Sequence, residues 1–488
     1  MIKVKSLKKS LLTNVTYLYL IPCTLYLILQ LYSLSIYPLP WFDEVFFASI
    51  SQQLFTNGEL IPSVSSTAMN HSELVLYGPV YFVIQGFFVK ILGLGMWQSR
   101  LPNFLFGIFL IYPLFEIISN SFNINKLTIF LLGITLFLFD PFYNLSLHEG
   151  RMDLMAICWF FLAFYFYQSA NNQHTSPIFL SLSLLTTPRS LVLIIPFLVL
   201  MLFSNSKQII FRYLSIFVGI IFICLLWKYQ SYLDLVLNLF SGFDNADNQR
   251  SITEFLFFNG YIPVHVKPII FATLLVYLVC MVSNKNFIIQ LPILVKWAIG
   301  TLVIHYVFIY DFGPYSIYVL PSWYILFYYG LLQLKVVYKY LSISILTLVL
   351  LFNVSIFSLK NYYAFSSISS RNEKEASKQL ARLIPSKSRI IGDATYFYIS
   401  KNLGHKYEIM NFFSSLEKRE LKQRTMFKYQ YIIVSDIEKK RMKDVFDYYA
   451  QKSKLQKVGE IKLPIAQKVW LVSDFDKFGF NASVYKVE

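Results

Sequence analysis

Residues 11–44 read LLTNVTYLYLIPCTLYLILQLYSLSIYPLPWFDE, an apolar run that ends in two prolines, a tryptophan and an acidic pair. The run from Leu11 to about Leu39 is too long for the apolar part of a signal peptide, and it has no small-residue cleavage site. Four lysines precede it, so we expect a first membrane-spanning helix whose basic end lies in the cytoplasm. This stretch therefore predicts a membrane protein.

The composition of the whole chain supports the same interpretation. Of its 488 residues, 56% are apolar, 18% are aromatic and only 14% are charged, and the mean hydropathy is +0.53. A soluble protein of this length has a large exterior that must be covered by polar groups. Lipid must cover the apolar surface of this chain instead. The four cysteines lie in or beside apolar runs and have no metal-type spacing.

The charged residues divide the chain at about residue 360. Residues 360–488 hold 25 of the 43 Lys and Arg and 14 of the 27 Asp and Glu. We therefore predict a transmembrane domain over residues 1–359 and a soluble domain over residues 360–488. The net charge of +16 suits anionic lipid head groups and does not indicate a nucleic-acid partner. Within the tail, a helix at 372–383, strands at 388–393 and 429–436 and a helix at 437–450 predict a small α/β fold.

Apolar runs of roughly 17–25 residues predict about eleven spanning helices. They cover residues 12–36, 101–118, 127–145, 154–169, 177–187, 189–204, 210–228, 266–283, 289–309, 315–334 and 340–358. The stretch 79–94 is short and is broken by Gly86 and Lys90, so we expect a juxtamembrane helix there. With this count the loops at 38–100 and 146–153, the turn at 186–189 and the tail all face outside. If 79–94 spans the membrane, the tail lies in the cytoplasm.

Asp43 and Glu44 are the first ionisable pair next to the membrane, where such groups are costly and tend to mark sites. From Glu44 to Leu54 apolar residues recur at helical spacing, which predicts an amphipathic helix at the membrane interface. A helix N-terminus favours the negative charge of the pair. The pair is a candidate catalytic centre, while Asp43 can also be a simple N-cap; the residues alone leave both interpretations open.

A second polar cluster, residues 148–153, reads HEGRMD and lies between two apolar runs. Glu149 and Asp153 are four residues apart, so one helical face can carry both, with Arg151 turned away. The cluster suits a group that holds a sugar-phosphate donor. An interfacial ion pair worth ~0–1 kcal/mol has the same pattern.

Arg189 follows a polar break, Thr186-Thr187-Pro188, inside an apolar stretch. An arginine in such a turn suits bidentate phosphate binding, although an arginine whose charge reaches up to the interface looks the same. A divalent metal is an open alternative, with His71, Glu73 and His265 as weak candidate ligands because their positions have no ligand spacing. No other cofactor is expected.

The segment W-F-D-E-x-x-F-x-x-I, residues 41–50, directly follows the first span and resembles the C-type glycosyltransferases. It is most similar to the branch of the protein O-mannosyltransferases and the lipid A aminoarabinose transferases. Later motifs agree in order: the helix YGPVYFVIQGFFVKILGLG at 77–95, Arg-Leu-Pro at 100–102, Arg-x-Asp at 151–153, the basic residue after Thr-Thr-Pro and Tyr-x-x-Pro at 318–321. The resemblance covers residues 12–335.

This resemblance implies an α-helical polytopic membrane enzyme that moves a monosaccharide, with inversion, from a polyprenyl-phosphate donor. The acceptor would be a hydroxyl or phosphate on a glycan, lipid or protein of the cell envelope. Asp43 would act as general base, supported by Glu44 and Asp153. The arginines Arg100, Arg151 and Arg189 would bind the donor phosphate. Further substrate candidates are Glu149, Tyr77, His71 and Tyr318. The implied location is a bacterial inner membrane, with the site and the tail on the extracytoplasmic side.

The sequence also departs from this family. Gly78 precedes Pro79 where the aminoarabinose transferases carry a lysine, so that phosphate contact must come from elsewhere. The His-Pro-Pro motif and the inserted luminal domain of the mannosyltransferases are missing, so protein O-mannosylation is not expected. A transporter or flippase of lipid-linked sugars and a ligase-like membrane protein remain the alternative functions. The loop at 229–265 would support the ligase-like alternative.

Overall fold

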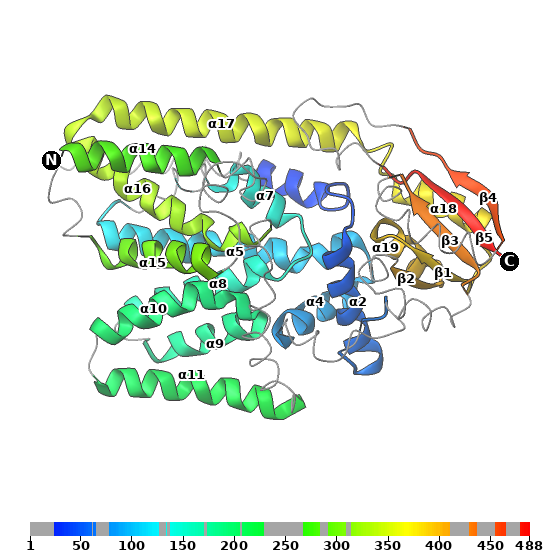
Figure 1. Ribbon diagram of the computed structural model, residues 1–488, viewed down its shortest axis with the longest axis horizontal. Coiled ribbons are helices and arrows are strands. Elements are labelled where there is room, and N and C mark those ends of the chain that lie inside the picture. The colour runs from blue at the N-terminus through cyan, green and yellow to red at the C-terminus, as the bar shows by residue number, and fades with distance from the viewer. Residues whose placement is uncertain are drawn as a thin grey trace, which may run out of the picture.

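The structure is a computed structural model, and it describes residues 24–60, 62–64, 78–125, 133, 137–169, 173–204, 207–228, 267–283, 291–308, 314–409, 429–436, 454–464 and 479–488. A body of long helices lies beside a smaller domain that contains a β-sheet (Figure 1). Two helices, α2 (Phe42–Asn57) and α4 (Pro79–Leu92), lie where the two parts meet (Figure 1).

The helices of the body follow the predicted apolar runs. They are α5 (Met96–Phe122), α8 (Asp153–Gln168), α9 (Ser176–Thr186), α10 (Leu191–Ser204), α11 (Lys207–Lys228), α14 (Lys267–Ser283), α15 (Ile293–Phe308), α16 (Leu320–Val337) and α17 (Lys339–Ser366). The described end of the first predicted span is helical over 24–33. Short 3-10 turns, η1 (Gln173–Thr175), η2 (Pro188–Ser190) and η4 (Pro314–Tyr318), precede α9, α10 and α16.

The predicted span 127–145 lies partly outside the described residues, and its end differs from a continuous helix. Asp140 caps a separate short helix, α7 (Pro141–Leu147), by accepting hydrogen bonds from the backbone N–H groups of Phe142 and Tyr143, both at 2.9 Å. A buried carboxylate at this place starts a new helix because its oxygens satisfy the first free backbone donors.

Two of the described helices, Met96–Phe122 and Lys339–Ser366, are long and apolar enough to cross a membrane, and the other apolar helices are shorter. Large apolar side chains are exposed on the outside of the body, among them Phe203, Phe211, Phe271, Val282 and Leu348. Apolar surface of this extent is typical of a face that contacts lipid or another protein.

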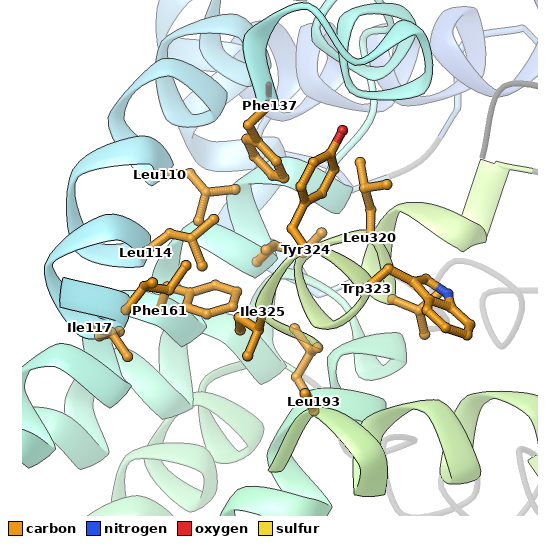
Figure 2. Close-up of a cluster of buried hydrophobic side chains, with 14 of the residues drawn as sticks. Leu110, Leu114, Ile117, Phe137, Phe161, Leu193, Leu320, Trp323, Tyr324 and Ile325 are labelled. Carbon is orange, nitrogen blue, oxygen red and sulfur yellow. The ribbon is translucent and has the colours of Figure 1, made fainter. Parts of the chain in front are cut away.

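Apolar side chains from α5, α8, α10 and α16 meet inside the body. Leu110 and Leu114 of α5 and Phe161 of α8 pack with Tyr324 and Ile325 of α16 (Figure 2). These side chains are buried, and full burial of one such residue contributes about 1.5–3 kcal/mol. This packing holds the helices that carry the loops described below.

The smaller domain contains a mixed five-stranded sheet with the order β2-β1-β3-β5-β4. The strands are β1 (Arg389–Gly392), β2 (Lys406–Ile409), β3 (Tyr431–Ser435), β4 (Leu455–Ile461) and β5 (Ala482–Val487). The helices are α18 (Glu373–Leu383) and α19 (Phe397–Asn402), and the 3-10 turn η5 (Ala394–Tyr396) precedes α19. The strand β1 pairs in parallel with β2 and β3, and β5 pairs antiparallel with β3 and β4. The predicted helix at 372–383 and the strands at 388–393 and 429–436 are present. The predicted helix at 437–450 lies outside the described residues.

The helix α2 is not an amphipathic helix with one exposed face, contrary to the prediction. Its residues from Glu44 to Ser51 are all buried, because α4 covers it on one side and the smaller domain covers it on another. A single apolar cluster contains Val45 and Phe47 of α2 together with Tyr396 and Phe397 of the smaller domain. The helix α17 also continues past residue 360 to Ser366. The two parts of the chain thus share one core around α2.

Candidate active site

The start of α2 places the acidic pair. Trp41 is the N-cap residue, in an extended conformation, and Asp43 and Glu44 lie in the first turn. Asp43 is therefore not the N-cap, which was the alternative interpretation of this residue. The positive end of the helix dipole stabilises the negative charge of both carboxylates. Neighbouring residues on a helix nevertheless point in different directions. The two side chains accordingly have different partners.

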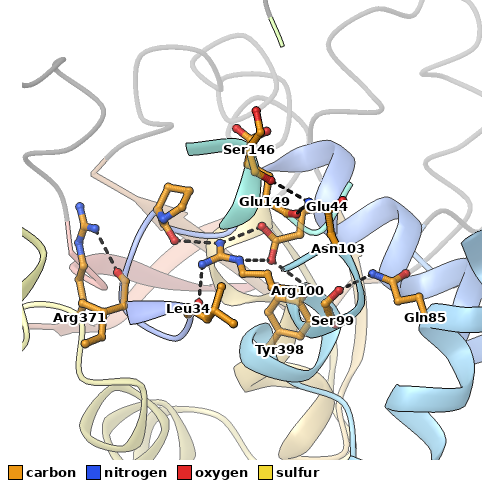
Figure 3. Close-up of polar contacts among 12 residues, drawn as sticks. Leu34, Glu44, Gln85, Ser99, Arg100, Asn103, Ser146, Glu149, Arg371 and Tyr398 are labelled. Atoms are coloured by element: carbon orange, nitrogen blue, oxygen red, sulfur yellow. Dashed lines mark hydrogen bonds and ion pairs between the residues drawn. The ribbon is translucent and has the colours of Figure 1, made fainter. Parts of the chain in front are cut away.

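Glu44 forms a fully buried, two-pronged ion pair with Arg100 of α5 (Figure 3). The Arg100 Nε donates to Glu44 Oε1 at 2.9 Å and its Nη2 donates to Oε2 at 2.8 Å. The backbone carbonyl of Leu34 accepts a hydrogen bond from Nη1 of Arg100 at 2.7 Å, and that of Pro38 accepts one from Nη2 at 2.8 Å. Each nitrogen of Arg100 thus donates to Glu44 or to a backbone carbonyl among the described residues, an arrangement that favours a structural role over the phosphate binding that we predicted for it.

Burial raises the pKa of Glu44, and the charge of Arg100 lowers it again. The hydroxyl of Tyr398, from α19 of the smaller domain, donates to Glu44 Oε1 at 3.3 Å, and the backbone of Gly150 adds a further hydrogen bond. A Cβ at residue 150 would lie 2.8 Å from Cγ of Glu44, so only glycine fits against this carboxylate. Glu44 therefore acts as the centre of a packed polar core.

Arg151 joins the other two acidic residues of the site. Its Nη1 donates to Asp43 Oδ2 at 2.6 Å and its Nε donates to Asp153 Oδ2 at 2.7 Å. The prediction that Arg151 turns away from Asp153 was wrong, because α8 begins only at Asp153 and Glu149 lies in the preceding loop. The guanidinium is 3% exposed, whereas the side chain of Asp43 is 23% exposed. Asp43 is thus the accessible member of this group.

Two aromatic rings and a second arginine surround Arg151. Its guanidinium carbon lies 5.0 Å from the ring centres of Trp41 and Tyr315. Arg189 lies over the same Tyr315 ring at 3.6 Å, and its own turn is fixed by a hydrogen bond from its backbone N–H to Thr187. The ring therefore holds two positive charges at one place.

The loop that carries Glu149 is fixed through its backbone. Nδ2 of Asn103 donates to the carbonyls of Ser146, at 2.7 Å, and Glu149, at 2.9 Å (Figure 3). The side chain of Glu149 is half-buried. Burial raises the pKa of Glu149 to about 7, and the charge of Arg151 lowers it only in part. The backbone of this loop is thus held by Asn103, and burial favours the neutral form of its carboxyl group.

The position of Gly78 explains the missing lysine. A Cβ at this residue would lie 1.7 Å from the carbonyl oxygen of Leu185 in α9. The start of α4 is therefore pressed against α9, and no side chain fits at residue 78. Arg189 comes shortly after the end of α9 in the sequence, and its guanidinium lies over the ring of Tyr315.

The structure brings together Asp43, Arg151, Asp153 and Arg189, with Glu44, Arg100 and Glu149 next to them. Tyr318 is buried at the end of η4. The predicted residues Tyr77, His71, Glu73 and His265 lie outside the described part of the chain. Among the described residues, no three His, Cys, Asp or Glu side chains are grouped as metal ligands.

Sequence reasoning missed Tyr315 and Tyr398. Tyr315 precedes the Tyr318 motif by one helical turn, so its spacing was a usable signal. Tyr398 lies in the smaller domain, where nothing in the sequence connects it with Glu44.

The comparisons with known proteins concern the fold and one segment of the chain. Residues 77–228 match the family model of dolichyl-phosphate-mannose-protein mannosyltransferase. Two crystal structures of ArnT from Cupriavidus metallidurans, one in the apo state and one bound to undecaprenyl phosphate, match with a TM-score of 0.56, at 14% identity, over 96% of this chain and 98% of that chain. No curated protein matches the sequence. The matched segment and the shared fold confirm that this chain resembles the C-type membrane glycosyltransferases, as the order of its motifs predicted.

Proposed function

We propose that the protein is an inverting glycosyltransferase that moves a monosaccharide from a polyprenyl-phosphate donor to a hydroxyl or phosphate acceptor of the cell envelope. The observation that carries this proposal is the bridge that Arg151 makes between Asp43 and Asp153, beside Arg189. A partly exposed carboxylate then lies next to two guanidinium groups. Transfer from a sugar phosphate needs one group that accepts a proton and others that stabilise an anion.

Asp43 is the proton acceptor in this proposal. Its Oδ2 is held by Arg151 at 2.6 Å, while no hydrogen bond to Oδ1 comes from the described residues. Oδ1 would take the proton of the acceptor hydroxyl as that oxygen attacks the anomeric carbon. The bond from the anomeric carbon to the phosphate oxygen breaks on the opposite face, and polyprenyl phosphate leaves with the bonding electrons. Attack opposite the leaving group inverts the anomeric centre.

Arg189 is the main phosphate ligand in this proposal, and Arg151 is a positioning residue for Asp43. Arg189 is half-buried and therefore accessible, whereas the Arg151 side chain is 3% exposed and already holds two carboxylates. A guanidinium can bind two oxygens of one phosphate. Arg100 becomes a positioning residue as well, because the hydrogen bonds of its guanidinium with the described residues go to Glu44 and backbone carbonyls.

The comparisons support the class of donor. One of the two ArnT structures has undecaprenyl phosphate bound, and the matched family model is described by a dolichyl-phosphate-linked sugar. Undecaprenyl phosphate and dolichyl phosphate are both polyprenyl phosphates. The proposal further locates the site and the domain after Ser366 at the extracytoplasmic face of a bacterial inner membrane.

The test is sugar transfer from a panel of polyprenyl-phosphate sugars by the purified full-length protein. We expect Asp43→Asn to lower the transfer rate about 10²–10⁴-fold, because the amide cannot accept the proton. Binding of undecaprenyl phosphate should change little. Asp436→Asn, at an exposed carboxylate after β3, is the matched control and should transfer at the wild-type rate.

Wild-type rates in Asp43→Asn would exclude Asp43 as the base. A wild-type protein that binds polyprenyl phosphate but transfers no sugar from any donor of the panel would favour a transporter or flippase of lipid-linked sugars.

A further inference from the structure

His148 is a buried residue of the loop that carries Arg151, and the proposed mechanism leaves it unused. The residue is 2% exposed. Its Nδ1 lies 2.7 Å from the carbonyl oxygen of Asn144, one turn back in α7, and its Nε2 lies 2.8 Å from the hydroxyl oxygen of Ser33. The imidazole therefore joins the C-terminal end of α7 to the last turn of the helix over 24–33.

The helix α7 is itself fixed by buried hydrogen bonds to two other helices. At its start, Asp140 accepts a hydrogen bond from the hydroxyl of Tyr324 in α16 at 2.8 Å. Further along, Nδ2 of Asn144 donates to Oε1 of Gln30, in the helix over 24–33, at 2.6 Å. Buried polar groups that have their partners make a structure rigid. The helix α7 is thus a firm support for the loop that follows it.

The two ends of the Ser33–His148 contact lead directly to the two sides of the site. Ser33 comes immediately before residues 34–41, the segment that enters α2 and brings Asp43 into place. His148 comes three residues before Arg151. The partners of the Asp43–Arg151 bridge, which are 2.6 Å apart, are thus carried by two separate segments. The Ser33–His148 contact joins these segments near the points where they begin.

We infer that His148 is a positioning residue for the bridge between Asp43 and Arg151. By holding Ser33 against the end of α7, the imidazole keeps the segment before α2 at the place where Arg151 reaches Asp43. This inference rests on the proposed function, in which Asp43 accepts the proton of the acceptor hydroxyl. Misplacement of a reacting group by about 1 Å can lower a rate about 10²-fold, so a buried bond outside the reaction centre can control the rate of transfer.

The direction of the hydrogen bonds follows from the partners of the ring. The Asn144 carbonyl only accepts, so Nδ1 of His148 carries a proton. Burial lowers the pKa of His148 to about 4, so the ring is neutral near pH 7 and its Nε2 is an acceptor. The donor is the Ser33 hydroxyl. The Gln30 carbonyl also lies 3.0 Å from this hydroxyl, but it already accepts from the N–H of Leu34.

The experiment measures kcat for sugar transfer and, separately, the Kd for undecaprenyl phosphate in the purified full-length protein. Ser33→Ala removes the donor to Nε2 and leaves the ring in place. His148→Asn keeps an N–H near the position of Nδ1 and loses the group that reaches Ser33. The matched control is Ser35→Ala, because the Ser35 hydroxyl donates to the Tyr32 carbonyl at 3.2 Å and has no part in this contact. Thermal unfolding shows which variants are folded.

We expect Ser33→Ala and His148→Asn each to lower kcat about 10–100-fold. The Kd for undecaprenyl phosphate should change little, because the proposed phosphate ligand Arg189 lies on a different turn, η2. The double variant should lose no more activity than the more damaged single variant, since both substitutions remove the same bond. Ser35→Ala should match the wild type in both measurements.

Wild-type kcat in both single variants would overturn the inference and leave the proposed function standing. Losses of kcat that multiply in the double variant, or an affinity that falls in parallel with kcat, would also overturn it, because the two residues would then not act on Asp43 through one shared bond. Ser33→Ala decides alone if His148→Asn does not fold. Wild-type protein that transfers no sugar from any donor of the panel would overturn both the inference and the proposed function.

Discussion

Asp43 and Glu44 are neighbours in sequence and have opposite environments. Glu44 points towards α5 and is enclosed with Arg100, while Asp43 points towards α8, remains partly exposed and meets Arg151. The turn of about 100° between successive helical residues separates them. One carboxylate is therefore enclosed in a buried ion pair, and the other remains partly accessible.

The buried Arg100–Glu44 pair gives a prediction for stability. Arg100→Leu leaves the Glu44 carboxylate buried without its counter-ion, so we expect a loss of about 3–5 kcal/mol in the free energy of unfolding. Chemical unfolding in detergent measures it. Arg382→Leu, at an exposed arginine of α18, is the control and should lie within about 0.5 kcal/mol of the wild type.

A double variant distinguishes the effect of an unpaired buried charge from the effect of lost side-chain volume. In Glu44→Leu/Arg100→Leu no charge is left buried alone, so it should be more stable than Arg100→Leu. If the double variant were the less stable of the two, the uncompensated charge would not be the cause of the loss.

At the scale of elements, the contact between α2 and α4 positions the acidic pair. Gln85 of α4 joins three helices: its Oε1 accepts from Ser51 of α2 at 2.7 Å, and its Nε2 donates to the Ser99 carbonyl of α5 at 2.8 Å. Gly86, the next residue, lets the backbones approach. A Cβ there would lie 2.8 Å from the Ser51 carbonyl oxygen and 2.3 Å from the ring of Phe55.

Gly86→Ala tests this close approach. The added methyl group must push α4 away from α2, because backbone atoms cannot give way as a flexible side chain can. We expect a loss of about 1–3 kcal/mol in the free energy of unfolding, as for overpacked cores. Gly219→Ala in α11, where a Cβ would meet nothing within 4 Å, is the matched control and should be neutral or stabilising. Equal stability in the two variants would exclude tight packing of α2 on α4.

The helices of the body were predictable because an apolar run of sufficient length has few other structures available in lipid. The strands β2, β4 and β5 were missed, since charged residues such as Lys406, Lys457 and Lys486 interrupt their apolar alternation. The burial of α2 was missed for a different reason. Its partners in α19 lie at the other end of the chain, and local periodicity carries no information about such distant packing.

At the residue level of the site, the sequence could supply the motif residues but not their pairing. Asp43, Arg151 and Asp153 were predicted as site residues, but Arg151 was expected to turn away from Asp153, and the pairing of Arg100 with Glu44 was not expected. The sequence could not supply these pairings, because an arginine that binds a phosphate and one that binds a carboxylate have the same local pattern.

At the scale of the whole molecule, the smaller domain is part of the site. Tyr398 reaches Glu44, Nη1 of Arg371 donates to the Ile36 carbonyl at 3.1 Å, and the N–H of Ile409 in β2 donates to the Val64 carbonyl at 2.9 Å. These bonds connect both ends of the segment around α2 to the domain after α17. The shared apolar cluster fills the space between them.

Removal of residues 367–488 should therefore do more than remove a docking surface for the acceptor. It would expose the apolar side chains of α2 and take away a hydrogen bond from Glu44. We expect the truncated protein to lose undecaprenyl phosphate binding and sugar transfer together, and to aggregate in detergent as measured by size-exclusion chromatography. A monodisperse truncated protein that still binds undecaprenyl phosphate would show that α2 holds its place alone.

The bond between Ile409 and Val64 places residue 64 beside β2, the last strand on that side of the described sheet. The sheet and the segment that leads to residue 64 are thus joined in the fold, although they are distant in the sequence. A chimaera that exchanges this domain with that of a related enzyme would have to carry the segment from about Ile36 to Val64 along with it. Specificity that differs between relatives is therefore best traced by transplanting both segments together.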